Sequence, residues 1–503
     1  MAHKINKEHG MFDSATLGHK IGKEDYRQRE GVLRQALLAA QFKLKQLGDF
    51  PVVILLAGVP TGGRGEIASL LNEWMDPRHI ASHAFGEPTD EEADRPPLWR
   101  YWRALPPKGS SAIFFGGWYH GPVWDALRGE CQADFEHEIE QLTRFERMLA
   151  SEGVLLMKFW LHLPKADLKK RLKQLESDPL TAWRVCDEDR WFLKNYDQIL
   201  DACQQMLQGT NLAFAPWRVV EGNDANYRAI SVGQQLLDAL NARFDKQFQP
   251  YGDAAPLLPS VDGVRLLDKL ELNHKLGKQD YERRLAEAQG RLNQLTRKRG
   301  FKKMGVITVF EGMDAAGKGG SIRRITAALD VRQYGIVPIA APTDEERAQP
   351  YLWRFWRHVP PHGQVRIFDR SWYGRVLVER VEGFASQFDW MRGYNEINDF
   401  EAQLDAANII VVKFWLAIDS DEQLRRFKER ESIEWKHFKI TDEDWRNRDR
   451  WDDYIVAASD MIDRTSSAIA PWHLIGANNK YHARVTILET LCDAIEARLK
   501  RKE

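Results

Sequence analysis

Hydrophobic residues along this chain gather into short, nearly continuous runs, which are separated by segments of mixed polarity and helical length. The clearest runs lie at residues 52–56, 112–115, 154–161, 306–310, 365–368 and 409–418. A run without alternation predicts a strand that is buried on both faces. Charged segments at about 24–47 and 279–299 precede the first run of each half and predict long helices. Strands that alternate with helices in this order predict an α/β fold with a parallel sheet covered on both faces.

The pattern occurs twice because the chain repeats itself. At an offset of 254 residues, the segment 88–109 overlays 342–363 with fourteen identities in 22 positions. At an offset of 255, HKIGKEDY at 19–26 overlays HKLGKQDY at 274–281. A period this long is far beyond that of a solenoid repeat, so it indicates tandem duplication of a whole domain.

A change of composition marks the boundary between the two copies. The segment QPYGDAAPLLPS, residues 249–260, is rich in proline, glycine and alanine and predicts a linker. We therefore expect domains at 1–248 and 263–503, joined by a linker at about 249–262. A length of 503 residues agrees with this division, because it suits two large domains better than one.

Charge and cysteine content narrow the function classes. The net charge of -1 gives no overall field that favours a polyanion, so any basic surface is local and nucleic-acid binding is not expected. The longest apolar runs, at 52–59 and 409–416, are too short to cross a bilayer, and the first residues contain no apolar secretory segment. We therefore expect a cytoplasmic protein without membrane contact. The four cysteines lack metal-ligand and redox spacing, which is typical of thiols in a reducing compartment. They are Cys131, Cys186, Cys203 and Cys492.

A phosphate-binding loop is predicted after the strand at 306–310. In the following EGMDAAGKGG, Gly312, Gly317 and Lys318 fit the pattern G-x-x-x-x-G-K. Small residues let backbone N–H groups turn toward a phosphate, the next helix points its positive end there, and the lysine adds a charge. The other loop residues expected to bind phosphate are Ala315, Ala316 and Gly319. The alternative is a glycine-rich turn without phosphate, which the flanking strand and helix disfavour.

The loop departs from the standard pattern at one position. Gly319 stands where a Ser or Thr normally ligates magnesium, and Ser321 comes two residues too late. Asp314 inside the loop and Asp369 at the end of the strand 365–368 are therefore the candidate metal ligands, although a turn or cap residue is the alternative for Asp369. Two carboxylates that face one phosphate chain suit one or two Mg²⁺ ions.

Arginines are dense just after this strand and again late in the second copy. They are Arg370, Arg375 and Arg380 in the first group, and Arg426 and Arg430 in the second. Guanidinium groups match phosphate oxygens bidentately, and a mobile basic segment over the site acts as a lid. Acidic residues interleave with the late group, so a solvated helix with i,i+4 ion pairs is an even alternative for any one of these arginines.

The motifs of the second copy, taken together, resemble those of the polyphosphate kinase 2 family. They are GMDAAGKGG, YLWRFWRHVPPHG, IFDRSWYGRVLVERVEGF, KFWLAIDSDEQLRRF and APWHLI, in this order. Both copies show the likeness, and the fused form looks like the family's two-domain polyphosphate:AMP phosphotransferase branch. The resemblance implies a three-layer α/β/α fold like that of thymidylate kinase, with a helical lid. It also implies Mg²⁺-dependent transfer of the terminal phosphoryl group of inorganic polyphosphate to AMP, which gives ADP.

The resemblance assigns roles to residues of the second copy. Asp314 and Lys318 take the Walker A positions, and Asp369 and Arg370 take the Walker B positions; we expect these four to be catalytic. The lid arginines are Arg426 and Arg430, and Arg375 and Arg380 are further candidates for substrate binding. The phosphate of AMP is already anionic near neutral pH, because its second pKa is about 6. The barrier is therefore mostly alignment and charge repulsion, and the two aspartates are expected to hold metal and to position the substrates.

The first copy lacks these residues. In the overlay, Asp314, Lys318, Asp369 and Arg370 correspond to Pro60, Arg64, Phe115 and Gly116. Both expected metal ligands are absent, so we expect this domain to be non-catalytic. Arg64 can still bind an anion, and binding of polyphosphate by the first copy is left open.

Several alternatives stay open in the sequence. An ATP-dependent nucleoside or nucleotide kinase fits the same fold, and a non-enzymatic polyphosphate-binding protein fits the first copy. Arg354 and Arg357, in the aromatic segment YLWRFWR, either shape the acceptor side of the site or pack in the core. The acceptor among AMP, GMP and deoxynucleotides is open as well. Two fused copies mimic a dimer of single domains, and we expect them to pair again in a homo-oligomer.

Overall fold

The computed structural model describes residues 10–501, apart from 128, 130–131, 246–264, 435–439 and 441. The chain forms two compact units. The first takes in Met1–Pro88, Arg100–Tyr251 and Thr343–Tyr351, and the second takes in Thr89–Trp99, Gly252–Pro342 and Leu352–Glu503. The expected linker at about 249–262 lies outside the described residues.

The first unit contains a five-stranded sheet in which every pair of neighbours is parallel. The strand order is β2-β3-β1-β4-β5. The strands are β1 (Val52–Gly58), β2 (Ile80–Ala84), β3 (Ser111–Phe115), β4 (Leu155–His162) and β5 (Trp217–Glu221). The central strands β1 and β4 are almost wholly buried, as continuous apolar runs predict.

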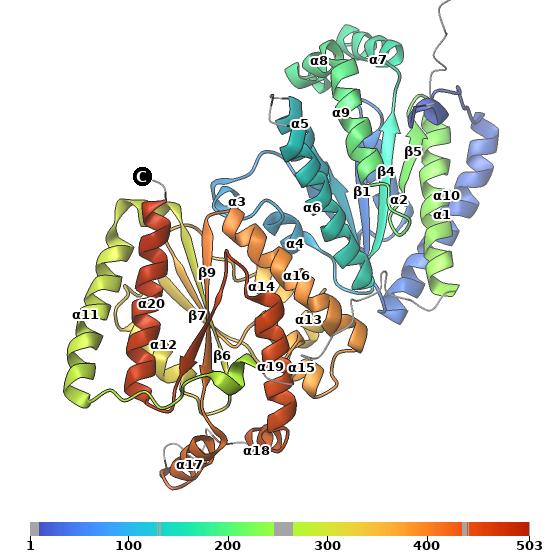
Figure 1. The fold of residues 1–503 in the computed structure, drawn as a ribbon. Coiled ribbons are helices and arrows are strands. Elements are labelled where there is room, and N and C mark those ends of the chain that lie inside the picture. The colour runs from blue at the N-terminus through green and yellow to red at the C-terminus, as the bar shows by residue number, and fades with distance from the viewer. Residues whose placement is uncertain are drawn as a thin grey trace, which may run out of the picture. The chain divides into compact units, whose positions relative to one another are not determined.

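Helices cover both faces of this sheet (Figure 1). Helices α1, α2 and α10 pack together on one face, and α5, α6 and α9 pack on the other. The α-helices among residues 10–245 are α1 (Lys23–Leu47), α2 (Arg64–Trp74), α3 (Asp90–Ala93), α4 (Trp99–Ala104), α5 (His120–Leu127), α6 (Gln132–Ser151), α7 (Lys165–Ser177), α8 (Asp187–Lys194), α9 (Tyr196–Gly209) and α10 (Ala225–Asp245).

The second unit repeats this plan. Its sheet is again parallel, in the order β7-β8-β6-β9-β10. The strands are β6 (Gly305–Gly312), β7 (Tyr334–Pro338), β8 (Val365–Asp369), β9 (Ile409–Ala417) and β10 (Trp472–Gly476). The equivalent strands of the two units occupy the same places, so the internal repeat of the sequence is a repeat of topology.

The helices of the second unit form the same two layers, with α11, α12 and α20 on one face and α15, α16 and α19 on the other (Figure 1). The α-helices among residues 265–501 are α11 (Lys278–Arg297), α12 (Lys318–Thr326), α13 (Asp344–Arg347), α14 (Trp353–Trp356), α15 (Val378–Val381), α16 (Gln387–Ala406), α17 (Ser420–Glu431), α18 (Asp442–Asp449), α19 (Trp451–Thr465) and α20 (Lys480–Lys500). The expected α/β fold, a doubled three-layer α/β/α domain with a parallel sheet, is confirmed.

Each sheet has two outer strands that the hydrophobic pattern did not predict. Strands β2 and β7 each bury only one of their five residues, so they carry no continuous apolar run. Strands β5 and β10 are only five residues long and include polar positions. Edge strands with one covered flank do not need the uniform hydrophobicity by which the central strands are recognised.

A buried ion pair lies beneath each sheet and is the same in both units. Lys413 Nζ donates to Glu401 Oε2 over 2.7 Å, and its counterpart Lys158 donates to Glu146 over 2.7 Å. Burial raises the pKa of both glutamates and lowers the pKa of both lysines. Because this polar network occurs in both units, we assign it to the scaffold rather than to the chemistry.

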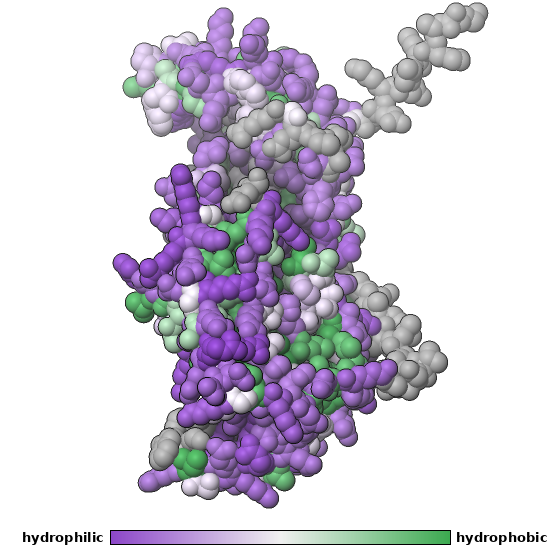
Figure 2. Space-filling model, turned by 60° about the vertical axis from the view of Figure 1, so that its left-hand side comes forward, coloured by the Kyte–Doolittle hydropathy of each residue, from purple (hydrophilic) through white to green (hydrophobic). Residues whose placement is uncertain are grey.

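The surface is mostly hydrophilic. In the view of Figure 2, hydrophilic side chains cover most of the face and hydrophobic residues form small groups between them. None of the helices in the described ranges combines the length and the apolar character that crossing a bilayer requires.

Candidate active site

The loop between β6 and α12 has the backbone of a phosphate-binding turn. Gly312 has φ 136°, and a Cβ atom there would lie 2.3 Å from the carbonyl oxygen of Leu416, so only glycine fits. Gly317 has φ 115° and precedes the first turn of α12, while Ala315 takes the left-handed region with φ 64°. These angles direct the loop around the N-terminus of α12, where backbone N–H groups attract anions.

Lys318 begins α12 and curls back over the loop. Its Nζ donates to the carbonyl oxygen of Gly312 over 2.6 Å and lies 3.4 Å from that of Met313. The lysine charge is thereby held at the rim of the loop, in the pocket that the loop encloses.

Asp314 is held from two sides. Arg370 Nη2 donates to one carboxylate oxygen over 3.1 Å, and Asn447 Nδ2 of α18 donates to the other over 2.9 Å. Burial acts to raise the pKa of Asp314, but the charges of Lys318 and Arg370 and the bond from Asn447 outweigh burial and hold the pKa below its ordinary value. The carboxylate is therefore ionised at neutral pH and points into the site.

Asp369 and Arg370 enter the site from the end of β8. The register pairs Phe310 of β6 with Asp369 of β8, so both strands end at the same edge of the sheet. Arg370 follows with φ 65°, in the left-handed region that non-glycine residues seldom adopt, and its N–H donates to the carbonyl oxygen of Phe310. This turn aims the Arg370 side chain at the loop.

These residues line a pocket of ≈ 360 Å³. Of the expected residues, the pocket lining includes Asp314, Ala315, Ala316, Gly317, Lys318, Gly319, Asp369, Arg370 and Arg430. It also includes residues that the sequence did not single out as ligands, namely Gly320, Arg323, Pro338, Ile339 and Asp444. Ser321 is buried instead, with its hydroxyl directed at the carbonyl oxygen of Gly317, so it does not replace the missing loop Ser or Thr.

Arg375 and Arg380 lie outside the pocket lining. Arg375 pairs with Glu379 one turn further along, at 3.2 Å. Arg380 pairs with Asp460 at 2.7 Å and lies over the ring of Trp390. Both guanidinium groups thus contact the helices behind the site rather than the phosphate-binding loop.

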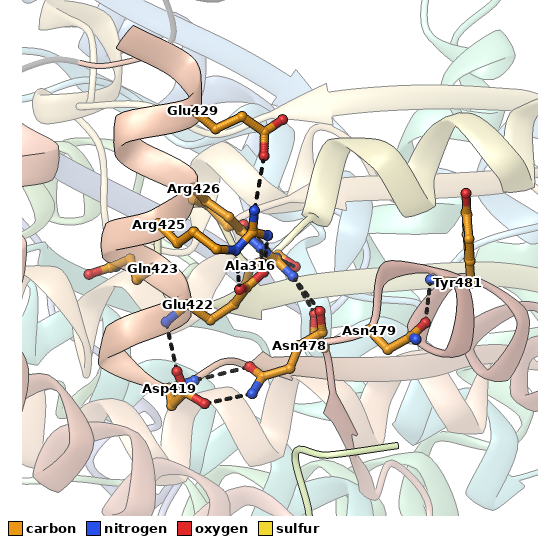
Figure 3. A network of polar contacts seen from close by, with 12 residues as sticks. Ala316, Asp419, Glu422, Gln423, Arg425, Arg426, Glu429, Asn478, Asn479 and Tyr481 are labelled. Atoms are coloured by element: carbon orange, nitrogen blue, oxygen red, sulfur yellow. Dashed lines mark hydrogen bonds and ion pairs between the residues drawn. The ribbon is translucent and has the colours of Figure 1, made fainter. Parts of the chain in front are cut away.

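Arg426 supports the loop from beneath (Figure 3). Its guanidinium donates to the carbonyl oxygens of Ala315 and Ala316, each over 2.9 Å, and to that of Ala477 over 2.6 Å. Glu422 of the same helix accepts from Nε, and only 2% of the Arg426 side chain is exposed. In this arrangement every direction of the guanidinium fork faces protein atoms, so Arg426 fixes the shape of the loop.

The first unit retains this support after losing the site. Arg171, the counterpart of Arg426 at an offset of 255, donates to the carbonyl oxygens of Thr61, Gly222 and Asn223 over 2.8, 3.2 and 2.9 Å. These carbonyls correspond to those that Arg426 contacts. A contact shared with a copy that has lost its catalytic residues belongs to the scaffold.

The same comparison applies to the aromatic segment of α14. Arg354 is buried and donates to the carbonyl oxygen of Ala340 over 3.0 Å, and its counterpart Arg100 donates to that of Gly86 over 2.8 Å. Trp353 and its aromatic neighbours are buried as well. The structure favours the packing interpretation of this segment over an acceptor-binding one.

Glu311 is a site residue that sequence reasoning missed. It is 5% exposed at the end of β6 and accepts a hydrogen bond of 2.8 Å from the hydroxyl of Ser371. Burial raises the pKa of Glu311, although Lys318 and Arg370 act in the opposite direction. A signal was present in the repeat, because the first copy has Ala57 at this position and lacks the carboxylate.

More of the site is replaced in the first copy than the four expected residues. At the offsets of 254 and 255, Glu311, Ser371, Arg430 and Asn447 correspond to Ala57, Gly117, Leu175 and Phe192. The strand registers support this alignment, since β1 pairs Ala57 with Trp160 and β6 pairs Glu311 with Trp415. The residues around the second pocket are thus lost together, while Arg426 and the buried lysine–glutamate pair are kept.

Two of the three carboxylates that line the pocket, those of Asp314 and Asp369, fit a magnesium ion that completes its shell with phosphate oxygens and water. In the described part of the chain, no group of three or more His, Cys, Asp or Glu is placed to hold a metal by protein ligands alone. Magnesium in phosphoryl-transfer sites typically binds one or two carboxylates plus substrate phosphates, so two aspartates are sufficient. Asp314 keeps lone pairs for a metal, because each of its oxygens accepts one hydrogen bond here.

Comparisons with known proteins agree with this geometry. The model of the family described as polyphosphate kinase 2 matches residues 20–248 and again 275–503. The chain is 54% identical to the polyphosphate:AMP phosphotransferase of Pseudomonas aeruginosa over 496 residues, which cover 98% of this chain and 100% of that protein. It is 37% identical to the polyphosphate:AMP phosphotransferase of Acinetobacter johnsonii over 92% of this chain and 95% of that protein. A crystal structure of a polyphosphate kinase 2 from Pseudomonas aeruginosa superposes with a TM-score of 0.88 at 52% identity, over 98% of this chain and 100% of that one.

The chain therefore belongs to the polyphosphate kinase 2 family, with two family domains in tandem. It is a phosphotransferase with an α/β fold.

Proposed function

We propose that the protein transfers the terminal phosphoryl group of inorganic polyphosphate to AMP, giving ADP, and that the second unit performs the reaction. The observation that carries the proposal is the joint presence of Asp314, Lys318, Asp369 and Arg370 around one anion-binding pocket. Two full-length relatives named polyphosphate:AMP phosphotransferase support the donor and the acceptor.

The charges of the pocket fit a phosphoryl chain. Lys318, Arg323, Arg370 and Arg430 provide four cationic side chains, and the start of α12 adds its backbone N–H groups. Fixed positive groups of this kind stabilise charge that spreads over the transferring phosphoryl group, which is the main task in this class of reaction.

Within this proposal each residue has a defined task. Lys318 and Arg370 neutralise the phosphoryl oxygens, and the bond from Arg370 to Asp314 fixes the geometry between loop and strand end. Asn447 of α18 joins the basic segment to the loop through Asp314. No strong general base is required, because the phosphate of AMP is already anionic above its second pKa of about 6.

We propose Mg²⁺ as the cofactor, with Asp314 and Asp369 as its protein ligands. When bound, the ion neutralises phosphate charge and brings donor and acceptor together. The departure at Gly319 supports this choice of ligands, since the usual hydroxyl ligand of a P-loop is missing and the carboxylates of Asp314 and Asp369 both line the pocket.

An ATP-dependent nucleotide kinase is the second candidate, because it uses the same fold. The test is ADP formation by the purified full-length protein from AMP, polyphosphate and Mg²⁺, with ATP as a parallel donor. We expect turnover with polyphosphate, little with ATP, and none when Mg²⁺ is omitted.

The matched variants are Lys318→Ala and Lys302→Ala. Lys318→Ala is expected to reduce kcat by about 100- to 1,000-fold, the usual loss on removing one charge-stabilising donor. Lys302 is exposed and outside the pocket, so Lys302→Ala is expected to behave as wild type. Turnover with ATP alone would refute the proposed donor, and an active Lys318→Ala variant would refute the proposed site.

A cytoplasmic location and homo-oligomer formation stay predictions of the sequence. Light scattering on the purified protein tests self-association.

A further inference from the structure

The first unit contains a cavity that shares four aligned lining positions with the pocket of the second unit, namely Pro60, Arg64, Gly116 and Asp189. It has a volume of ≈ 150 Å³ and is bordered by the loop after β1, the end of β3 and helices α5, α8 and α9. Two of the replacements open this space: Ala57 stands where the second unit has Glu311, and Ile199 stands where it has Tyr454. The cavity therefore lies where smaller side chains stand in place of larger ones.

The walls of the cavity are largely apolar and aromatic. Trp160, Trp217 and Tyr119 line it and are at least 92% buried, and Phe192 closes it from α8. Cys203 also lines it, and burial raises the pKa of its thiol to about 12, so the thiol is uncharged at neutral pH. Aromatic walls favour a flat apolar ligand over a hydrated phosphate chain.

One cation faces this apolar space. Arg64 begins α2 at the place of the catalytic Lys318, and it lines the cavity. Its guanidinium carbon lies 4.9 Å from the centre of the Phe115 ring, and among the described residues it has neither a hydrogen bond nor an ion pair. Burial lowers the pKa of Arg64, while the charge of Asp189 acts in the opposite direction.

The other charged side chains at the cavity disfavour a ligand that carries many negative charges. Glu188 is exposed at the border, and Asp189 accepts a hydrogen bond of 2.9 Å from the backbone N–H of Cys186 at the start of α8. One arginine and two carboxylates give the cavity no net positive charge, so a polyanion is disfavoured and a single negative group is held only by direct contact with Arg64. The second pocket differs, because its four cationic side chains outnumber its three carboxylates.

We propose that this cavity of the first unit binds a small aromatic monocarboxylate, with its ring between the aromatic walls and its carboxylate on Arg64. A cavity of about 150 Å³ holds a single six-membered ring, as known cavities of this size do, and is too small for a whole nucleotide. An arginine fork matches the two oxygens of a carboxylate. The proposal concerns a second ligand site and does not depend on the donor or acceptor of the catalysed reaction.

The test is calorimetric titration of the full-length protein with benzoate, and with benzamide as its uncharged analogue of nearly equal shape. We expect one saturable site per chain for benzoate, with a Kd of about 1 mM or below, and at least tenfold weaker binding of benzamide. This comparison uses the unaltered protein, so it stands even if a variant folds poorly. In Arg64→Gln the preference for benzoate over benzamide is expected to disappear.

A control variant separates the two units. Lys318→Ala changes the catalytic pocket and is expected to leave benzoate binding intact. The proposal is overturned if benzoate does not saturate by about 10 mM, if benzamide binds equally well, or if binding is lost in Lys318→Ala. It is also overturned if Arg64→Gln, introduced into the Lys318→Ala protein, abolishes binding of polyphosphate, because the cavity is then a polyanion site.

Discussion

At the scale of single residues, Glu311 stands out because its surroundings oppose its charge. It is buried at the end of β6, and burial raises its pKa above the ordinary value of 4.5. A buried carboxylate that costs stability and is absent from the first copy is a candidate for a functional group, since active sites tolerate such costs.

The sign of its pH effect follows from the raised pKa. The folded protein holds the proton of Glu311 more tightly than the unfolded chain does. The loss of folding stability caused by ionisation of Glu311 is therefore absent below about pH 4.5 and grows as pH rises through the folded-state pKa. Glu311→Gln removes the charge and keeps an oxygen for the hydroxyl of Ser371. We expect Glu311→Gln to be more stable than wild type at neutral pH, with a Tm difference that shrinks toward pH 4.5, and to lose activity.

Thermal unfolding between pH 4.5 and 8 measures this difference. The control is Glu282→Gln on the exposed face of α11, which is expected to show no such trend. A Tm difference that is constant across this range would contradict the assigned pKa direction.

Some residues of the site could be predicted from the sequence, and Glu311 could not. Asp314, Lys318, Asp369 and Arg370 were predicted to act together, and the pocket brings all four together, because the spacing of a P-loop and a strand end is local information. Glu311 escaped prediction because a single carboxylate at the end of an apolar run has no motif. Only the position of Ser371 at the end of the neighbouring strand shows that the carboxylate belongs to the site.

At the scale of elements, α17 presents three arginines with three different tasks. Arg425 is on the exposed face and pairs with Glu422 and Glu429, Arg426 holds the loop, and Arg430 lines the pocket. The sequence could not separate them, because Arg426 and Arg430 lie one turn apart on the same helix face. Which of the two reaches the pocket depends on where the loop passes the helix.

We expect alanine at each position to give a different result. Arg430→Ala is expected to lower kcat/KM for polyphosphate by about 10- to 100-fold, the value of a charge-assisted contact. Arg426→Ala is expected to cost on the order of 2–3 kcal/mol of stability, because several buried carbonyls lose their donor. Arg425→Ala is the matched control and is expected to change both quantities little, as exposed ion pairs do.

Steady-state kinetics with polyphosphate as the varied substrate and urea unfolding separate these outcomes. Loss of activity in Arg426→Ala without loss of stability would show that Arg426 acts on the substrate, as the lid assignment from the sequence implies. Arg171→Ala in the first unit is expected to destabilise the protein in the same way, because its contacts are equivalent.

At the scale of the whole molecule, two copies of one fold differ in chemistry while sharing a scaffold. The strand order, the buried lysine–glutamate pair and the arginine beneath the loop are common to both. At least eight positions around the pocket differ, and half of them were visible in the P-loop and strand-end motifs. The others lie on α17 and α18 or at the strand ends, where only the folded chain brings them to the site.

This distribution predicts that restoring the motif residues is not enough. The substitutions Pro60→Asp, Arg64→Lys, Phe115→Asp and Gly116→Arg, made together in the Lys318→Ala protein, are expected to give less than about 1% of wild-type turnover, because further donors and carboxylates are still missing and each is worth about 100-fold. Adding Ala57→Glu, Gly117→Ser, Leu175→Arg and Phe192→Asn is expected to raise turnover above that level. Robust activity from the first four alone would show that the other residues are dispensable.

The first unit keeps positive φ angles in the loop after β1 and at the end of β3, although the side chains there differ from those of the second unit. Thr61 retains φ 55° where Ala315 has φ 64°, and Gly116 retains φ 94° where Arg370 has φ 65°. Glycine adopts such angles without the cost of about 1–2 kcal/mol that other residues incur, so the first unit avoids this strain at Gly116 but retains it at Thr61. The first unit thus keeps positive φ angles at these two positions without the side chains that line the second pocket. During evolution, the cavity beside this loop can acquire a different ligand.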